Sequence, residues 1–132
     1  MTPQDLYRAK LTFADDAVTQ IGSGMNLAMG MAVAEPPALL EALGRRIENA
    51  GISDLRLWYF HSLEAAGKSV LRKELLDRVR PHCMFLSHIE RALIKGDTSG
   101  ATYGPIEFVP VAFSGSPQLL SERVDLDACI TT

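Results

Sequence analysis

Short apolar runs alternate with helical patterns along almost the whole chain, and this alternation limits the fold more than any other feature. Runs of strand character lie at about 26–32, 55–60, 83–86, 106–113 and 124–130. Apolar residues at helical spacing fill the segments at about 14–21, 38–47, 68–79, 89–94 and 117–122. This order predicts an α/β fold, with a largely parallel sheet of about five strands and helices on both faces.

Composition excludes several classes of function. The 132 residues are 47% hydrophobic and carry a net charge of -3, which fits one globular domain or an incomplete larger one. The densest basic cluster, Arg72 to Arg80, is interleaved with Glu74 and Asp77, so we expect no nucleic-acid partner. The N-terminus has no signal-peptide core and no apolar run approaches a membrane span, which predicts a cytoplasmic protein without a membrane partner.

Neither cysteines nor histidines form a metal-binding pattern. Cys83 and Cys129 are too few and too far apart for a disulfide framework or a zinc site, and they fit small core residues. No other spacing of His, Cys, Asp and Glu suggests a metal site. We therefore expect no bound metal.

Small and polar residues follow four of the predicted strands. They lie at Gly30 to Pro36, His61 and Ser62, Ser87 and His88, and Ser114 to Ser116. In parallel sheets the ligand crevice lies beyond the carboxyl ends of the strands, so these loops are candidate binding loops. The same residues are ordinary turn formers, and for any one loop alone the structural interpretation is favoured.

Candidate reactive groups are few. Glu35 is the only glutamate in a predicted strand-end loop. It also precedes a predicted helix, and an acidic residue at the start of a helix is more often a cap than a ligand contact. His61 and His88 follow strands and could exchange protons near neutral pH. Ser114 lacks the G-x-S-x-G context of a nucleophile and fits a hydrogen-bonding loop residue. No residue of this chain is predicted to be catalytic.

Several motifs occur in the order typical of one enzyme family. The opening carries Asp15 to Val18, Ser23 to Met25, Met29-Gly30, Glu35-Pro36 and Ala42-Leu43. Later matches are Phe85, Arg91, Gly96, Pro110-Val111, Phe113-Ser114, Pro117 and the closing run Asp125 to Ile130. Together they resemble the acetyl-CoA hydrolase/transferase family, which includes the 4-hydroxybutyrate CoA-transferases, over nearly the whole chain.

The resemblance implies a specific role. Members of this family are longer and have two α/β domains, the second of which carries a catalytic glutamate that forms a glutamyl-CoA thioester. Residues 1–132 would be a single α/β domain resembling the N-terminal part, with the C-terminal catalytic domain absent. The substrates would be a coenzyme A thioester and a carboxylic acid, and no cofactor would be covalently bound. The partner would be a C-terminal CoA-transferase domain or chain, so that the two parts form a hetero-oligomeric, split enzyme.

The resemblance also assigns one wall of the acyl-CoA site to two loops. Its substrate-binding residues would be Gly30, Met31, Ala32, Glu35, Ser114, Gly115 and Ser116. The chain departs from the family pattern at Gly115, where many relatives have an acid, and at Met31 or Ala32, where a glycine is common. The alternative is a non-catalytic α/β binding or scaffolding subunit that retains the fold.

Overall fold

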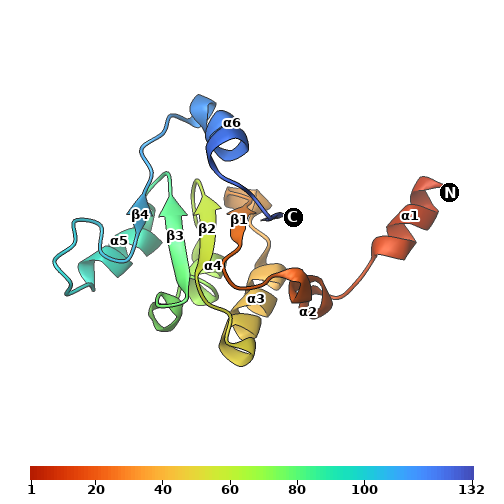
Figure 1. The fold of residues 1–132 in the computed structure, drawn as a ribbon, viewed down its shortest axis with the longest axis horizontal. Coiled ribbons are helices and arrows are strands. Elements are labelled where there is room, and N and C mark those ends of the chain that lie inside the picture. Colours follow the sequence, from red (N-terminus) through yellow and green to blue (C-terminus); the bar gives the residue numbers. More distant parts are fainter.

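A five-stranded sheet forms the centre of the computed structural model, which describes residues 1–132 (Figure 1). The strands are β1 (Asn26–Met29), β2 (Leu55–Tyr59), β3 (Val79–Cys83), β4 (Glu107–Phe108) and β5 (Ala128–Ile130). Their order is β4-β3-β2-β1-β5 and every pairing is parallel. The prediction of an α/β fold with a five-stranded, largely parallel sheet is confirmed.

Helices and short turns connect the strands. The helices are α1 (Pro3–Lys10), α2 (Ala14–Ala17), α3 (Pro37–Ala50), α4 (Glu64–Lys68), α5 (His88–Lys95) and α6 (Ser116–Gln118). Single turns of other helical types are η1 (Val18–Gln20), η2 (Ala32–Ala34), η3 (Lys73–Leu75), η4 (Phe113–Gly115) and η5 (Leu119–Arg123). None of the helices is both long and apolar enough to span a membrane.

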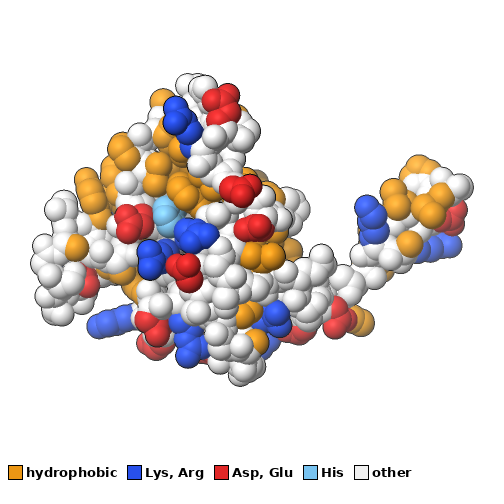
Figure 2. Space-filling view, viewed as in Figure 1, with side chains coloured by type: hydrophobic (Ala, Val, Ile, Leu, Met, Phe, Trp, Pro, Cys, Tyr) orange, Lys and Arg blue, Asp and Glu red, His pale blue; other side chains and the backbone are white.

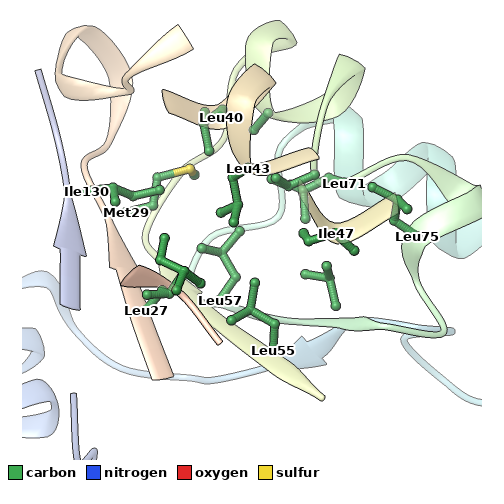
Figure 3. Close-up of a cluster of buried hydrophobic side chains, with 14 of the residues drawn as sticks. Leu27, Met29, Leu40, Leu43, Ile47, Leu55, Leu57, Leu71, Leu75 and Ile130 are labelled. Atoms are coloured by element: carbon green, nitrogen blue, oxygen red, sulfur yellow. The ribbon is translucent and has the colours of Figure 1, made fainter. Parts of the chain in front are cut away.

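The main core lies between the sheet and α3 (Figure 3). Leu40, Leu43 and Ile47 recur at helical spacing on α3 and are fully buried. Alternate residues of β2, Leu55 and Leu57, face them from the sheet and are buried to the same degree. Because full burial of such a side chain contributes about 1.5–3 kcal/mol, this layer is the main source of stability of the fold.

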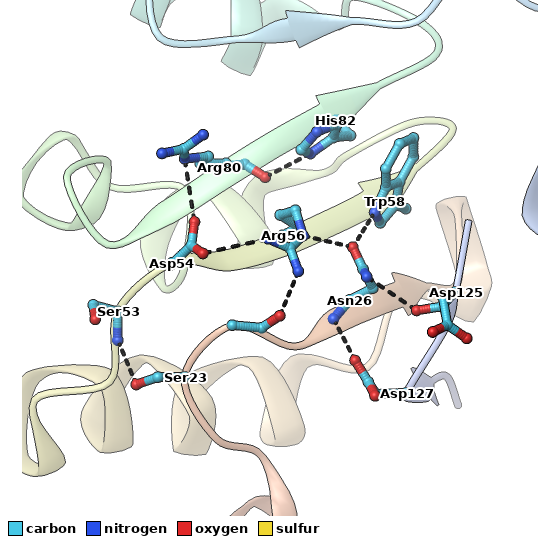
Figure 4. A network of polar contacts seen from close by, with 11 residues as sticks. Ser23, Asn26, Ser53, Asp54, Arg56, Trp58, Arg80, His82, Asp125 and Asp127 are labelled. Atoms are coloured by element: carbon cyan, nitrogen blue, oxygen red, sulfur yellow. Dashed lines mark hydrogen bonds and ion pairs between the residues drawn. The ribbon is translucent and has the colours of Figure 1, made fainter. Parts of the chain in front are cut away.

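The other sheet face is polar over β1, β2 and β3 (Figure 4). Arg56 donates to Asn26 Oδ1 at 2.8 Å and to Asp54 Oδ2 at 3.3 Å. Trp58 donates to the same Asn26 oxygen at 3.1 Å, and its ring stacks on His82 with centroids 4.1 Å apart. Burial lowers the pKa of His82. These contacts join β1, β2 and β3 across this face of the sheet.

The predicted helix over 68–79 and the third strand over 83–86 are wrong. Helix α4 ends at Lys68, turns follow, and β3 occupies Val79–Cys83. The apolar residues Val70, Leu71 and Leu75 have helical spacing, yet a chain of turns buries them equally well. Pro81 is tolerated inside β3 because pairing with β4 begins only at His82.

The predicted strand over 106–113 is much shorter in the structure. Only Glu107–Phe108 pairs with β3, and Val109 adds one further backbone hydrogen bond, to Cys83 O at 2.8 Å. Pro110 then removes the N–H that a continued ladder needs. Residues 110–112 are therefore irregular and partly exposed.

Helix α1 was not predicted and projects away from the body of the molecule (Figure 1). Its sequence carried the signals of a helix start, since Thr2 and Asp5 form a capping box and Pro3 occupies the first turn. None of its residues is buried.

The two cysteines differ sharply in their environment, which gives a simple prediction. Burial, with a further contribution from Glu90, raises the pKa of Cys83 to about 12, whereas Cys129 is exposed on β5. We expect a thiol reagent at pH 8 to modify Cys129 at least about 100-fold faster than Cys83, because the thiolate is the reacting form. Intact mass with time checks this, and unfolding in urea should equalise the two. Equal rates in the native protein would contradict the burial of β3.

Candidate functional site

The carboxyl ends of all five strands meet at one edge of the sheet, which we call the carboxyl edge. The loop of residues 30–35 follows β1, the turn of residues 60–63 follows β2, and Phe85 follows β3. Chain order also reverses here, since β5 lies beside β1 on the side opposite β2. Crevices outside such a switch point are the usual ligand sites of open α/β sheets. The structure therefore places the predicted loops where ligand binding is expected.

The loop after β1 is packed closely against the end of β5. Gly30 N donates to Ile130 O at 2.9 Å, and Thr132 N donates to Ala34 O at 3.1 Å. A side chain at Gly30 has no room, because its Cβ would lie 2.3 Å from Ala34 O and 2.6 Å from Thr131 Oγ1. Met31, by contrast, is 36% exposed, so this loop presents a side chain to solvent while its backbone is fixed.

Ala32 holds an uncommon backbone conformation. Its φ is +52°, in the left-handed region that favours glycine. Non-glycine residues in this region cost of order 1 kcal/mol or more, and they concentrate at functional sites.

Glu35 points into the protein and is only 4% exposed. Its Oε2 accepts from Leu63 N at 2.7 Å and its Oε1 accepts from Ala66 N at 2.8 Å. The carboxylate therefore caps the amino end of α4, the helix that follows β2. The expected cap of the helix that begins just after Glu35 is wrong, because the start of α3 receives no side-chain hydrogen bond. With both oxygens occupied by backbone N–H groups, Glu35 is badly placed to attack a substrate.

The second predicted loop crosses the carboxyl edge as η4 and α6. Ser114 is exposed, Gly115 is half-buried, and the Ser116 hydroxyl is buried, where it donates to Phe113 O. The Phe113 ring packs edge-on against Phe60, with centroids 5.0 Å apart. This contact places the loop of Ser114 beside the end of β2. Of its three predicted residues, Ser114 is the one whose side chain is free to meet a ligand.

Aromatic side chains at this edge were not predicted as site residues. Phe60 is half-buried at the end of β2, and the His61 ring lies 5.5 Å from that of Phe85. Phe85 and Phe113 are 53% and 61% exposed. Figure 2 shows hydrophobic side chains gathered between α6 and the strand ends, next to a band of charged side chains. The available signal was an aromatic residue close behind two of the strands, with Phe60 directly after β2 and Phe85 two positions after β3.

A buried carboxylate, Glu90, lies beneath the turn after β2. It accepts hydrogen bonds from Tyr59 Oη at 2.9 Å and from the Ser62 hydroxyl. It also accepts from Ser87 N at 2.8 Å, as part of the capping box of α5. Burial alone would raise its pKa, but the hydrogen bonds from Ser62, Ser87 and Tyr59 hold the pKa below its ordinary value of 4.5. Glu90 is therefore ionised at neutral pH.

The carboxyl edge is an open surface. None of the five hollows of the molecular surface is lined by residues 30–35, by the turn of residues 60–63, or by residues 113–116. No three His, Cys, Asp or Glu side chains lie together in a metal-binding arrangement. The edge thus has fixed loops, aromatic rings and one free hydroxyl, but it does not form a closed pocket by itself.

Comparison with known proteins finds solved structures that resemble this chain over nearly its whole length. No protein-family model matches the chain, and no curated protein is significantly similar to it. The crystal structure of RipA from Yersinia pestis matches with a TM-score of 0.91 and 41% identity, over 99% of this chain and 30% of RipA. Two RipA variants, with one glutamate replaced by alanine or by aspartate, match with a TM-score of 0.92, 41% identity and the same coverage. The chain spans less than a third of the proteins it matches.

Proposed function

We propose that this RipA-like chain is the N-terminal part or a subunit of a CoA-transferase or acyl-CoA hydrolase that acts in the cytoplasm. Its 1–132 α/β domain forms one wall of the acyl-CoA site, and a partner domain or chain supplies the catalytic glutamate. One observation carries the proposal: 41% identity to RipA extends over 99% of the chain, yet covers only 30% of RipA. The family motifs at the strand ends support the assignment to thioester chemistry.

The chemistry requires a carboxylate that this chain does not present. A glutamate oxygen attacks the thioester carbonyl, the C–S bond breaks, and the CoA thiolate leaves as a mixed anhydride forms. The thiolate then attacks the glutamyl carbonyl, which releases the carboxylate product and leaves a glutamyl-CoA thioester. Glu35 is occupied by two backbone N–H groups, so the nucleophile belongs to the partner. The RipA variants at one glutamate, numbered beyond the length of this chain, agree with that division.

The carboxyl edge supplies binding and orientation. The loop of Gly30, Met31 and Ala32 contributes a fixed backbone with one exposed apolar side chain, and the Ser114 hydroxyl is free to donate. Phe60 and Phe113 give an apolar surface against which an acyl chain or a pantetheine arm packs. This chain then supplies the binding surface and the partner supplies the catalytic glutamate. The assembled pair is a hetero-oligomer or a two-domain chain.

Replacing Ser114 by phenylalanine tests the ligand-binding role of its loop. Ser114 is exposed, so the larger ring is tolerated by the fold but blocks the surface beside Phe60. We expect acyl-CoA affinity of the assembled enzyme to fall by about tenfold or more, equivalent to about 1.4 kcal/mol. Ser53, exposed just before β2 at the opposite edge of the sheet and bonded only through its backbone, provides the control as Ser53→Phe. Unchanged affinity in Ser114→Phe, measured by isothermal titration calorimetry, would remove Ser114 from the site.

The alternative is a non-catalytic binding or scaffolding subunit. The occupied carboxylate of Glu35 is the observation that favours it, since the chain alone has no nucleophile at the carboxyl edge. A transfer assay distinguishes the two functions. The chain is combined with the remaining two-thirds of a RipA-like polypeptide, and transfer of CoA from an acyl-CoA to acetate is measured. Turnover that needs both parts supports the enzyme, and an assembled but inactive complex supports the scaffold.

A further inference from the structure

Two buried carboxylates hold the four-residue turn of residues 60–63 from opposite sides. Glu35 reaches it from the loop after β1, where its carboxylate accepts from Leu63 N at 2.7 Å and from Ala66 N at 2.8 Å. Glu90 reaches it from α5, where it accepts from the hydroxyl of Ser62. The exposed fractions of the two glutamates are 4% and 0%.

Burying two carboxylates costs more free energy than is needed merely to fold a four-residue turn. Taking a carboxylate out of water costs several kcal/mol unless hydrogen bonds replace its hydration. Here backbone N–H groups and hydroxyls replace it fully, and no buried side-chain polar atom of the molecule is left without a partner. A turn of this length packed only by apolar contacts would open locally at low free-energy cost. Charge-assisted hydrogen bonds from two directions prevent this.

The side chains fixed by this arrangement are Phe60 and His61. They lie between the anchored residues Tyr59 and Ser62, both buried and both bonded to Glu90. Phe60 meets Phe113 of the loop that carries Ser114, at 5.0 Å between centroids. Through Glu35 the same turn is joined to the loop of Met31, so two neighbouring loops move as one unit.

We propose that Glu35 and Glu90 are positioning residues, which fix Phe60 and His61 at the carboxyl edge in the geometry that binds acyl-CoA. This rests on the proposed function. Neither carboxylate touches substrate. Their effect is to hold the turn so that the acyl group meets a preformed surface, since a displacement of about 1 Å at a reacting centre can cost about 100-fold in rate.

The first test measures the turn in this chain without any ligand. Glu35→Gln keeps the side-chain volume but leaves one backbone N–H facing an amide NH₂ group. We expect amide hydrogen exchange at Leu63 and Ala66 to rise by about tenfold or more, because local opening becomes easier. The imidazole NMR signal of His61 should shift or broaden, while that of His82, stacked on Trp58, stays unchanged. An unaltered His61 signal and unaltered exchange would overturn the proposal.

The second test uses the assembled enzyme. Glu35→Gln should lower kcat/KM for acyl-CoA by about 10- to 100-fold, and so should Ser62→Ala, which removes the hydrogen bonds of the Ser62 hydroxyl to Glu90 and Ser87. Leu55→Ala is the matched control, because Leu55 is buried at the first position of β2, at the end of that strand opposite the turn. Its loss destabilises the core and leaves the hydrogen-bond partners of Glu35 and Glu90 in place. At temperatures where all variants are folded, its kcat/KM should equal that of the parent.

The outcomes separate the proposal from the function on which it rests. Greater mobility of the turn with unchanged kcat/KM overturns the positioning role and leaves the enzyme assignment intact. Equal losses in Leu55→Ala and Glu35→Gln overturn it as well, because a general loss of stability then explains both. If the parent assembly turns over no acyl-CoA, the proposed function fails, and the positioning of an acyl-CoA site fails with it.

Discussion

Glu90→Ala is expected to destabilise the chain by about 3–5 kcal/mol, the largest effect of any polar substitution in this molecule. Glu90 is fully buried and accepts hydrogen bonds from Tyr59, Ser62 and Ser87. Alanine leaves the Tyr59 hydroxyl and the Ser87 N–H without a partner in the protein interior, whereas the Ser62 and Ser87 hydroxyls keep only each other. It also opens a cavity beside them. Urea unfolding at pH 7, followed by far-ultraviolet circular dichroism, measures the loss.

The same carboxylate predicts how stability depends on pH. The hydrogen bonds hold the folded-state pKa of Glu90 below its ordinary value of 4.5, so the unfolded chain binds the proton more tightly. The contribution of Glu90 is therefore complete above about pH 4.5 and is lost as the pH falls through the lower, folded-state pKa. Glu90→Gln should be less stable than the parent at pH 7, and the difference should shrink in acid. A constant difference from pH 7 to pH 3 would contradict an ionised Glu90.

Gly30→Ala is expected to destabilise the chain by about 2–4 kcal/mol and to disturb the predicted binding loop. The added Cβ would lie 2.3 Å from Ala34 O, and backbone atoms cannot move aside as a flexible side chain can. The loop after β1 must therefore shift away from the end of β5. Urea unfolding gives the loss of stability.

Gly22→Ala is the matched control, because a Cβ there has no atom within 4 Å. It should change the free energy of unfolding by less than about 0.5 kcal/mol. If Gly30→Ala were equally mild, the close packing of residues 30–34 against Thr131 would be wrong. The assignment of this loop to a fixed wall of the site would then lose its physical basis.

The fold class could be predicted from the sequence because the patterns that indicate its helices and strands are local. Leu40, Leu43 and Ile47 repeat at helical spacing, and Gly51 ends α3 with a φ of +63°, in the conformation that glycine adopts most easily. Apolar runs at β1 and β2 mark the central strands. Errors arose where local pattern and tertiary packing disagree, as between Val70 and Val79, where turns bury residues of helical spacing.

The candidate site was predicted in part. The two loops of residues 30–35 and 114–116 do lie at one edge of the sheet, because parallel strands bring their carboxyl ends together. The partners of Glu35 and Glu90 could not be read from the sequence, since they lie 28 and 31 positions away for Leu63 and Tyr59. Contacts of that range depend on the register of strands and on helix placement, which no local pattern encodes.

The division of labour between this chain and a partner that carries the catalytic glutamate is tested most simply by intact mass. The protein is isolated from its own source with whatever chain it binds, and it is measured after brief exposure to acyl-CoA. We expect a covalent CoA adduct on a glutamate of a second polypeptide or an attached domain, and no CoA adduct on residues 1–132. An adduct on Glu35 would contradict it, as would a chain that is alone, stable and unable to turn over acyl-CoA.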